Sequence, residues 1–261
     1  MKTDYHVHSC FSDGKHTPEE IILSAIDKNI DVLGFSDHSY TYFDPDVCRN
    51  MEDTSEYVKQ IRSLAQKYKD KITVLCGIEQ DYFSKKPTED YDYIIGSVHY
   101  IKVQDKFFAV DDKPQIIVDM ANRYFGGDII SICEKYFELV GELKEKTGAD
   151  IIGHFDIISK FNQNNELFDS TDKRYVAAWK KAADKLLKQN VIFEINSGAI
   201  SREYRTTPYP SEEMMKYLSE NGAKFILSSD SHNKDTLVFK FEEMLANPVI
   251  AALNIVSNPK K

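Results

Sequence analysis

The histidines of this chain lie in short clusters with carboxylates, a combination that suits divalent metal ions. Seven histidines are present among 261 residues, and the first cluster reads Asp4-Tyr5-His6-Val7-His8. Two histidines at positions i and i+2 of a strand point to the same face, and imidazoles beside carboxylates are typical ligands of Zn, Fe or Mn. The other candidate groups are Asp37-His38, Glu79, Val98-His99, Gly153-His154 and Asp230-Ser231-His232.

Neighbouring residues within a cluster are expected to have different roles. Asp37 and His38 would point to opposite faces of an extended segment, so we expect His38 to bind metal and Asp37 to orient a ligand by hydrogen bonding. Asp4 is expected to orient the first histidine pair in the same way. His16 lies beside a predicted helix start, and from its position alone we expect a structural role.

Short apolar runs alternate with amphipathic segments along the chain, which predicts parallel strands joined by crossover helices. The predicted strands are Tyr5–Val7, Asp31–Phe35, Ile72–Ile78, Tyr93–Ser97, Ile151–Gly153, Val191–Ile195 and Phe225–Leu227. The predicted helices cover about 18–28, 53–69, 127–147, 172–189, 211–221 and 235–246. Segments 38–52 and 99–125 are expected to be long irregular loops, and the tail from about 257 is expected to be frayed.

About seven strand-helix units without a linker predict one α/β barrel domain over residues 1–261. In such barrels the chemistry lies at the carboxyl ends of the strands. Six of the seven predicted strands end at a candidate metal ligand, whereas the sixth ends at Glu194-Ile195-Asn196, which is polar but has no histidine. The candidate ligands are therefore expected to meet on one rim of the barrel.

The composition limits the classes of partner. A net charge of −9 argues against a general nucleic-acid or anionic-membrane surface. The four cysteines are scattered without a CxxC pair, and neither a signal peptide nor a long apolar run is visible, which together predict a cytoplasmic protein with reduced thiols. We expect a small-molecule substrate and a monomer or small homo-oligomer.

The combined motifs resemble the polymerase-and-histidinol-phosphatase (PHP) superfamily. The resemblance extends from residue 4 to residue 232. It lies in Asp4-Tyr5-His6-Val7-His8-Ser9, Ser12-Asp13-Gly14, Phe35-Ser36-Asp37-His38, Glu79, Gly96-Ser97-Val98-His99, Gly153-His154 and Ser229-Asp230-Ser231-His232. Within the superfamily, the length, the segment Tyr93–Tyr100 and Gly153-His154-Phe155-Asp156 look most like monofunctional histidinol-phosphate phosphatases.

This resemblance implies a distorted, TIM-like (β/α)7 barrel that holds three divalent metal ions at the carboxyl ends of its strands. The first metal would take His6, His8, Glu79 and Asp230, and the second would share Glu79 and add His99 and His154. The third would take His38, His232 and a ligand from the stretch Asp13–His16. Asp13 fits the family spacing better, and His16 is the alternative.

The implied activity is hydrolysis of L-histidinol phosphate to L-histidinol and phosphate in histidine biosynthesis. Clustered metals would lower the pKa of a bridging water, and the resulting hydroxide would attack phosphorus. Glu79, Asp230 and His232 are the candidate catalytic residues, with Asp230 or His232 as the acid–base group. Phosphate calls for a further cation. The candidates for substrate contacts are Lys160, Arg202 and Arg205 for the phosphate and Asp81 for the amine and imidazole.

Three alternatives stay open at this point. A PHP phosphoesterase could act on another phosphorylated metabolite or nucleotide, although the acidic charge disfavours a nucleic-acid substrate. A non-catalytic PHP module would be expected to have lost ligands, whereas every expected position here holds one. An amide hydrolase on a related barrel would usually carry a lysine at a strand end, and no predicted strand here ends at a lysine.

Overall fold

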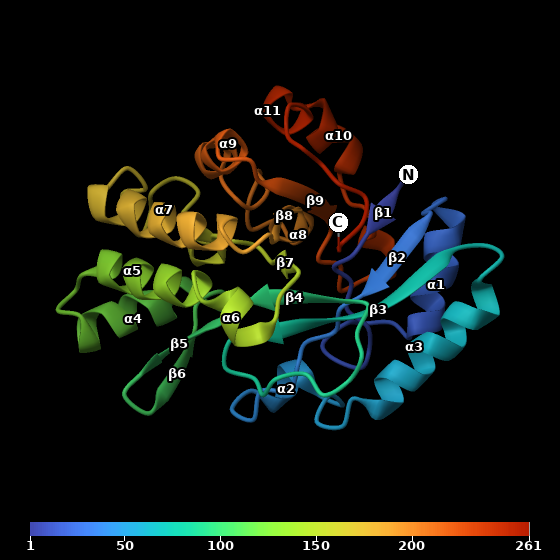
Figure 1. Cartoon of the computed structure of the whole chain (residues 1–261). Coiled ribbons are helices and arrows are strands. Elements are labelled where there is room, and N and C mark those ends of the chain that lie inside the picture. Colours follow the sequence, from blue (N-terminus) through green and yellow to red (C-terminus); the bar gives the residue numbers. More distant parts are fainter. Residues whose placement is uncertain (261) are drawn as a thin grey trace.

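The computed structural model describes residues 1–260 and contains a nearly closed barrel of seven parallel strands (Figure 1). The strands are, in spatial order, β1 (Thr3–Asp4), β2 (Val32–Phe35), β3 (Thr73–Asp81), β4 (Tyr93–Ser97), β7 (Ile151–Ile152), β8 (Ile192–Asn196) and β9 (Lys224–Ser228). The first and last strands, β1 and β9, are connected just after their carboxyl ends, where Val7 and Ser231 form a parallel β-bridge. The predicted α/β barrel is therefore confirmed.

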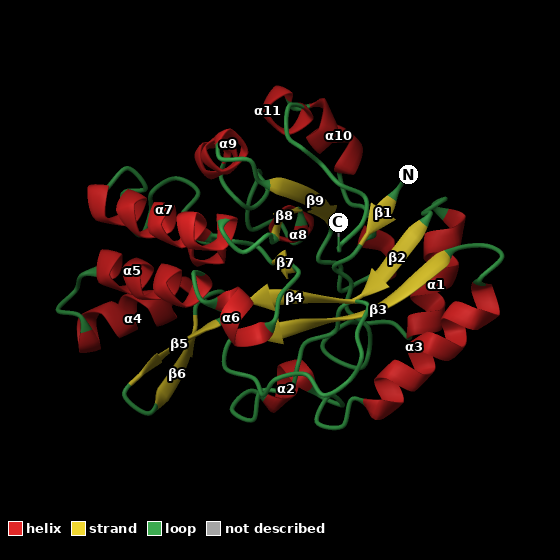
Figure 2. Cartoon of the chain, in the orientation of Figure 1, coloured by secondary structure: helices red, strands yellow, loops and turns green. Residues whose placement is uncertain are grey.

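Helices surround the strands, and one antiparallel hairpin projects from the barrel (Figure 2). The helices are α1 (Pro18–Asp27), α2 (Pro45–Cys48), α3 (Ser55–Tyr68), α4 (Pro114–Tyr124), α5 (Ile129–Val140), α6 (Leu143–Thr147), α7 (Lys173–Leu187), α8 (Gly198–Ser201), α9 (Glu212–Glu220), α10 (Phe241–Ala246) and α11 (Pro248–Ala251). The hairpin consists of β5 (Tyr100–Val103) and β6 (Lys106–Ala109). None of the helices in the described part of the chain combines the length and apolar character needed to cross a bilayer.

Helix α1 begins where its sequence predicts. The Thr17 side chain accepts from the backbone N–H of Glu20, and the Glu20 carboxylate accepts from the backbone N–H of Thr17. This capping box satisfies two backbone donors at the helix start. The loop that precedes α1 carries Asp13, so the capping box also secures one end of the segment that lines the site.

Tyr93 of β4 is fully buried and packs in one cluster with Tyr5, Ile95, Ile151, Ile192 and Ile226. Its hydroxyl donates to the backbone carbonyls of Tyr5 (2.6 Å) and Phe35 (2.9 Å). A side chain at Gly34 or Gly77 would collide with the Tyr93 ring, because that ring passes directly over both glycines. One phenol thus ties β4 to the ends of the first two strands, below the rim where the predicted ligands begin.

The expectation of long irregular loops was wrong for residues 99–125. This segment contains the β5–β6 hairpin and helix α4, whose buried side chains Ile117, Met120 and Ala121 follow the i, i+3, i+4 spacing of an amphipathic helix. Pro114 occupies the first turn, where its missing N–H costs nothing. The hairpin turn uses Gln104 at φ 55° instead of glycine, so it lacks the usual sequence signal.

Four further boundaries differ from the prediction, the first being that the predicted helix 127–147 is divided into α5 and α6 at Gly141 and Glu142. Segment 38–52 includes the short helix α2, and the last predicted helix starts at Phe241 rather than at about 235. The first strand pairs through Thr3–Asp4, two residues before the predicted range. Tyr5 and Val7 are nevertheless buried, Tyr5 in one cluster with Tyr93 and Val7 in another with Ile21 and Ile22 of α1, so their apolar character marks packing beyond the regular ladder.

Candidate metal centre

The carboxyl ends of the strands bring all nine predicted metal-ligand residues onto one rim of the barrel. Their ligand atoms form four overlapping groups, each with all of its atoms within 4.8 Å of one another. These groups are His8, Asp13, His38 and His232; His6, Glu79 and His154; His6, His8 and Asp230; and His38, Glu79 and His99. The overlap of the groups indicates a multinuclear site rather than a single isolated one.

Glu79, within β3, lies at the centre of this arrangement. Its Oε1 also accepts a hydrogen bond of 2.6 Å from the Ser97 hydroxyl, which holds the carboxylate in place. Five histidines surround the two oxygens: His38 Nδ1 (2.9 Å), His6 Nε2 (3.2 Å) and His8 Nε2 (3.5 Å) at Oε2, and His154 Nε2 (3.0 Å) and His99 Nε2 (3.3 Å) at Oε1. A single carboxylate therefore connects ligands from every one of these strand ends.

The electrostatics of the centre keep its carboxylates ionised. Burial works against the charged form of Glu79, but the charges of His6 and His99 hold the pKa of this carboxyl well below its ordinary value. His8 is different, because burial and the nearby His232 lower the pKa of its imidazole to about 3. A neutral imidazole beside ionised carboxylates is the protonation state that metal binding requires.

Within residues 1–260, several side-chain nitrogen and oxygen atoms of the candidate ligands are buried and have no hydrogen-bond partner. They are His6 Nε2, both ring nitrogens of His8, Glu79 Oε2 and His154 Nδ1. A buried polar atom left unpaired costs about 1–3 kcal/mol, so five such atoms in one place call for a group that satisfies them together. Imidazole and carboxylate lone pairs fit a divalent cation such as Zn, Fe or Mn. The residues present therefore fit a metal centre.

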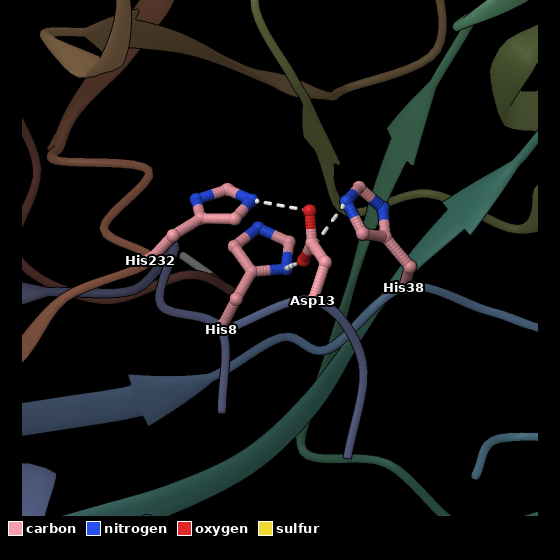
Figure 3. Close-up of side chains that lie close together, drawn as sticks. All are labelled: His8, Asp13, His38 and His232. Atoms are coloured by element: carbon pink, nitrogen blue, oxygen red, sulfur yellow. Dashed lines mark ion pairs between the residues drawn. The ribbon is translucent and has the colours of Figure 1, made fainter. Parts of the chain in front are cut away.

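Asp13, and not His16, lies with the outermost group of histidines (Figure 3). The Asp13 carboxylate is 3.0 Å from His232 Nε2 and 3.7 Å from His38 Nε2. His16 faces elsewhere, and its Nδ1 accepts from the backbone N–H of Lys234 at 3.4 Å. The geometry thus favours Asp13 as the oxygen ligand of this group.

We expect Asp13→Asn to lower the bound metal by about one ion per chain, because the amide has no charge with which to hold a cation between His38 and His232. Activity should fall by at least about 10–100-fold, the cost of losing even an orienting partner of a metal ligand. The matched change His16→Gln should leave both quantities unchanged. Elemental analysis of the two proteins measures the metal, and the opposite ranking would assign the ligand to His16.

The two aspartates expected to orient ligands hold loops instead of histidine rings. Asp37 accepts from the backbone N–H and hydroxyl groups of Ser9 and Ser12, and so secures the loop that carries Asp13. Asp4 accepts from the backbone and hydroxyl of Ser229, next to Asp230, and burial raises the pKa of its carboxyl to about 6. Both carboxylates support the site, but neither acts on a ring as we expected.

Asp230 has an unusual backbone conformation at the end of β9. Its φ of 49° lies in the left-handed region, which is less favourable for residues other than glycine, although aspartate adopts it more readily than most. Its Oδ1 is 3.4 Å from His8 Nε2, and its Oδ2 accepts from Arg202 Nη2 at 3.0 Å. A side chain at Gly198 would collide with Asp230 and Arg202, so glycine is required where α8 approaches the rim.

Of the three predicted phosphate-binding cations, only Arg202 contacts the candidate ligands. Its Nη1 donates to the Asp230 carbonyl and lies 3.2 Å from His232 Nδ1. Lys160 donates to the carbonyl of Asp111 (2.6 Å) and packs on the Tyr204 ring. Arg205 donates to the Ser159 hydroxyl at 2.6 Å and is buried. Lys160 and Arg205 are thus engaged by other parts of the chain.

Asp81 is also engaged by the protein rather than free for a substrate amine. Its Oδ2 accepts from the backbone N–H of His99 at 3.1 Å and lies 3.3 Å from His99 Nδ1, while its Oδ1 accepts from the Phe83 N–H. This is the orienting contact that we had expected of Asp37. The placement therefore differs from the predicted substrate contact.

Sequence reasoning missed Glu194, a fully buried carboxylate in the middle of β8. Its Oε1 is 2.6 Å from His6 Nδ1, and its Oε2 accepts from the backbone N–H of His154 at 2.7 Å. The available signal was a single acidic residue inside the apolar run 191–195, in the one predicted strand that does not end at a candidate metal ligand. An unexplained carboxylate at that position marks a partner for the histidines of neighbouring strands.

Comparison with known proteins agrees with this geometry. The chain is 28% identical over 240 residues to the "Probable histidinol-phosphatase" of Schizosaccharomyces pombe, with 82% of this chain and 74% of that protein covered. It is 26% identical to a protein of the same name from Deinococcus radiodurans, with 92% and 90% covered. The histidinol phosphate phosphatase of Lactococcus lactis, solved with Zn, L-histidinol and phosphate, superposes with a TM-score of 0.71 at 20% identity, covering 98% of this chain and 96% of that one.

Residues 4–198 of this chain match the sequence pattern of the PHP domain, and this match identifies the family. That range includes the strand ends that carry His6, His8, Glu79, His99 and His154. Asp230 and His232 lie beyond the matched range but complete the same rim in space. The sequence match and the clustered histidines and carboxylates on a seven-stranded barrel agree. The chain belongs to the PHP domain family.

Proposed function

We propose that this protein is a metal-dependent phosphomonoesterase that hydrolyses L-histidinol phosphate to L-histidinol and phosphate. The observation that carries the proposal is Glu79, whose two oxygens lie among five histidines with several buried ring nitrogens left unpaired. The family supports phosphoester chemistry, and the names of the relatives support the substrate.

We propose three divalent metals in this centre, held by overlapping sets of residues. His6, His8, Glu79 and Asp230 would hold the first, Glu79, His99 and His154 the second, and Asp13, His38 and His232 the third. The overlapping groups of ligand atoms support this assignment. When bound, such metals neutralise phosphate charge and supply a water of lowered pKa as nucleophile.

The chain's own residues would bind and orient the phosphate beside this centre. Arg202 would hold a phosphate oxygen with the N–H donors that its contacts to Asp230 and His232 leave free. Asp230 or His232 would handle the proton that moves between the attacking water and the leaving alkoxide. The His232 side chain is 22% exposed, whereas Asp230 is buried beside it, with its Oδ1 3.6 Å from His232 Nδ1.

A panel of phosphate esters tests the substrate. With Mn or Zn present, kcat/KM for L-histidinol phosphate should exceed that for phosphoserine, glucose 6-phosphate and a nucleoside monophosphate by at least about 100-fold, because a site that pairs its buried polar groups with the substrate rejects analogues that leave them unpaired. Phosphate release is the measurement. Comparable values for all four esters would contradict the substrate while leaving phosphoesterase activity in place. Chelation of the metals should abolish release from every ester.

A further inference from the structure

Glu194 occupies a position from which one carboxylate reaches two proposed metal ligands on different strands. It lies in β8, which pairs with β7 on one side and β9 on the other. Oε1 lies 2.6 Å from His6 Nδ1, whereas Oε2 accepts from the His154 backbone N–H (2.7 Å) and from Asn196 Nδ2 (2.8 Å). All four residues are at most 1% exposed, so these contacts are shielded from water.

The contact with His6 determines which ring nitrogen is free to bind metal. An ionised carboxylate can only accept hydrogen bonds, so the short contact to Glu194 places the ring proton on Nδ1. In the neutral ring that binds metal, the lone pair then lies on Nε2, which faces Glu79 Oε2 at 3.2 Å and Asp230 Oδ1 at 3.7 Å and has no hydrogen-bond partner among the described residues. This arrangement sets both the tautomer and the direction of the ligand.

The second oxygen acts on the backbone at the end of β7. It holds the N–H of His154, whose ring reaches Glu79 Oε1 through Nε2 at 3.0 Å. The proposed assignment puts His6 on the first metal and His154 on the second. The same carboxylate therefore links the ligand geometry of two neighbouring metals.

We infer that Glu194 is a positioning residue that holds His6 in its metal-binding tautomer and His154 at its place on the rim. It acts through these ligands and contacts neither substrate nor metal. The inference rests on the proposed metal centre and is independent of which phosphate ester is hydrolysed. It also assigns a function to the one predicted strand that does not end at a candidate metal ligand.

Glu194→Gln is the sharpest test, because glutamine has the same shape but replaces one acceptor oxygen with a donor NH2. His6, His154 and Asn196 each donate a hydrogen bond to the Glu194 carboxylate. In either orientation of the glutamine amide, its NH2 group would face at least one of these three donors, and that hydrogen bond would be lost. We expect metal affinity to fall by about 10–100-fold. At limiting Mn or Zn, kcat should fall far more than KM changes, and excess metal should partly restore it.

Asp156→Asn is the matched control, since Asp156 is also buried but accepts from Ser159 and from the backbone of Ser211. It should lower stability without changing metal affinity. Metal titration of the metal-free proteins provides the readout, and circular dichroism checks the fold. If wild type binds metal and Glu194→Gln binds it equally well, the role of Glu194 is wrong; if wild type binds none, the metal centre and the proposed function both fail.

A measurement on the wild-type protein covers the case in which the variant does not fold. In the Zn-loaded protein, nitrogen NMR of the histidine rings should show the His6 proton on Nδ1. A proton on Nε2 would overturn the inference, because that nitrogen could not then bind metal.

Discussion

Replacing Glu79 with glutamine should remove most of the bound metal and lower phosphatase activity by about 10³-fold or more. Loss of an orienting partner alone costs about 10–100-fold in metal affinity or activity. The loss of Glu79 should have a larger effect than the loss of an orienting partner, because its two oxygens lie within 3.5 Å of a ring nitrogen on each of five histidines. Glutamine would present an NH2 donor to some of these nitrogens and would carry no charge to attract a cation.

The electrostatic part of this effect extends beyond the metals. Glu79 is the shared anion that helps to keep the pKa of the His6 and His99 rings well above the ordinary value despite burial, together with Glu194 for His6 and as the main cause for His99. Without that charge, the rings lose a favourable partner in both the metal-free and the metal-loaded state. The variant should therefore unfold at a lower temperature than wild type as well as bind less metal.

Elemental analysis, steady-state kinetics and thermal unfolding of Glu79→Gln measure these three effects. Glu138→Gln, on the exposed surface of α5, makes the same chemical change away from the rim and should leave all three unchanged. Full metal content and near wild-type activity in Glu79→Gln would contradict a centre shared by these histidines.

The residues on the rim could be predicted because, in a barrel of parallel strands, the residue at which each strand ends lies at the same edge as the others. Each apolar run ends at a polar residue, and parallel strands deliver their carboxyl ends to one edge. That rule was enough to place His6, His154 and Asp230 together, although they are separated by more than 70 residues along the chain. It needed no knowledge of side-chain conformations.

The supporting contacts could not be predicted in the same way, because they depend on which neighbour a buried carboxylate reaches. Asp37 is adjacent to His38 in sequence but bonds to Ser9 and Ser12, whereas Asp81 orients His99 from a different strand. Such partners follow from rotamers and loop paths. Helix α4 could have been predicted, because Pro114 is typical of a helix start and Ile117, Met120 and Ala121 have the spacing of an amphipathic helix.

Asp230→Asn should lower kcat by about 10²–10⁴-fold, the usual contribution of a positioned acid–base group. Asparagine suits this test because it tolerates the left-handed backbone that Asp230 adopts at φ 49°. The substitution also keeps the volume and an oxygen that can still accept from Arg202. The loss would therefore report the missing charge and proton acceptor rather than backbone strain.

Metal analysis separates the two roles proposed for Asp230. Its Oδ1 lies 3.4 Å from His8 Nε2 and 3.7 Å from His6 Nε2, so loss of about one metal per chain would identify a ligand, and full metal content with low kcat would identify the acid–base group. Asp235→Asn, exposed on the same loop, should behave like wild type. Full activity together with full metal content in Asp230→Asn would exclude both roles and leave the proton transfer to His232, whose Nε2 already lies 3.0 Å from Asp13.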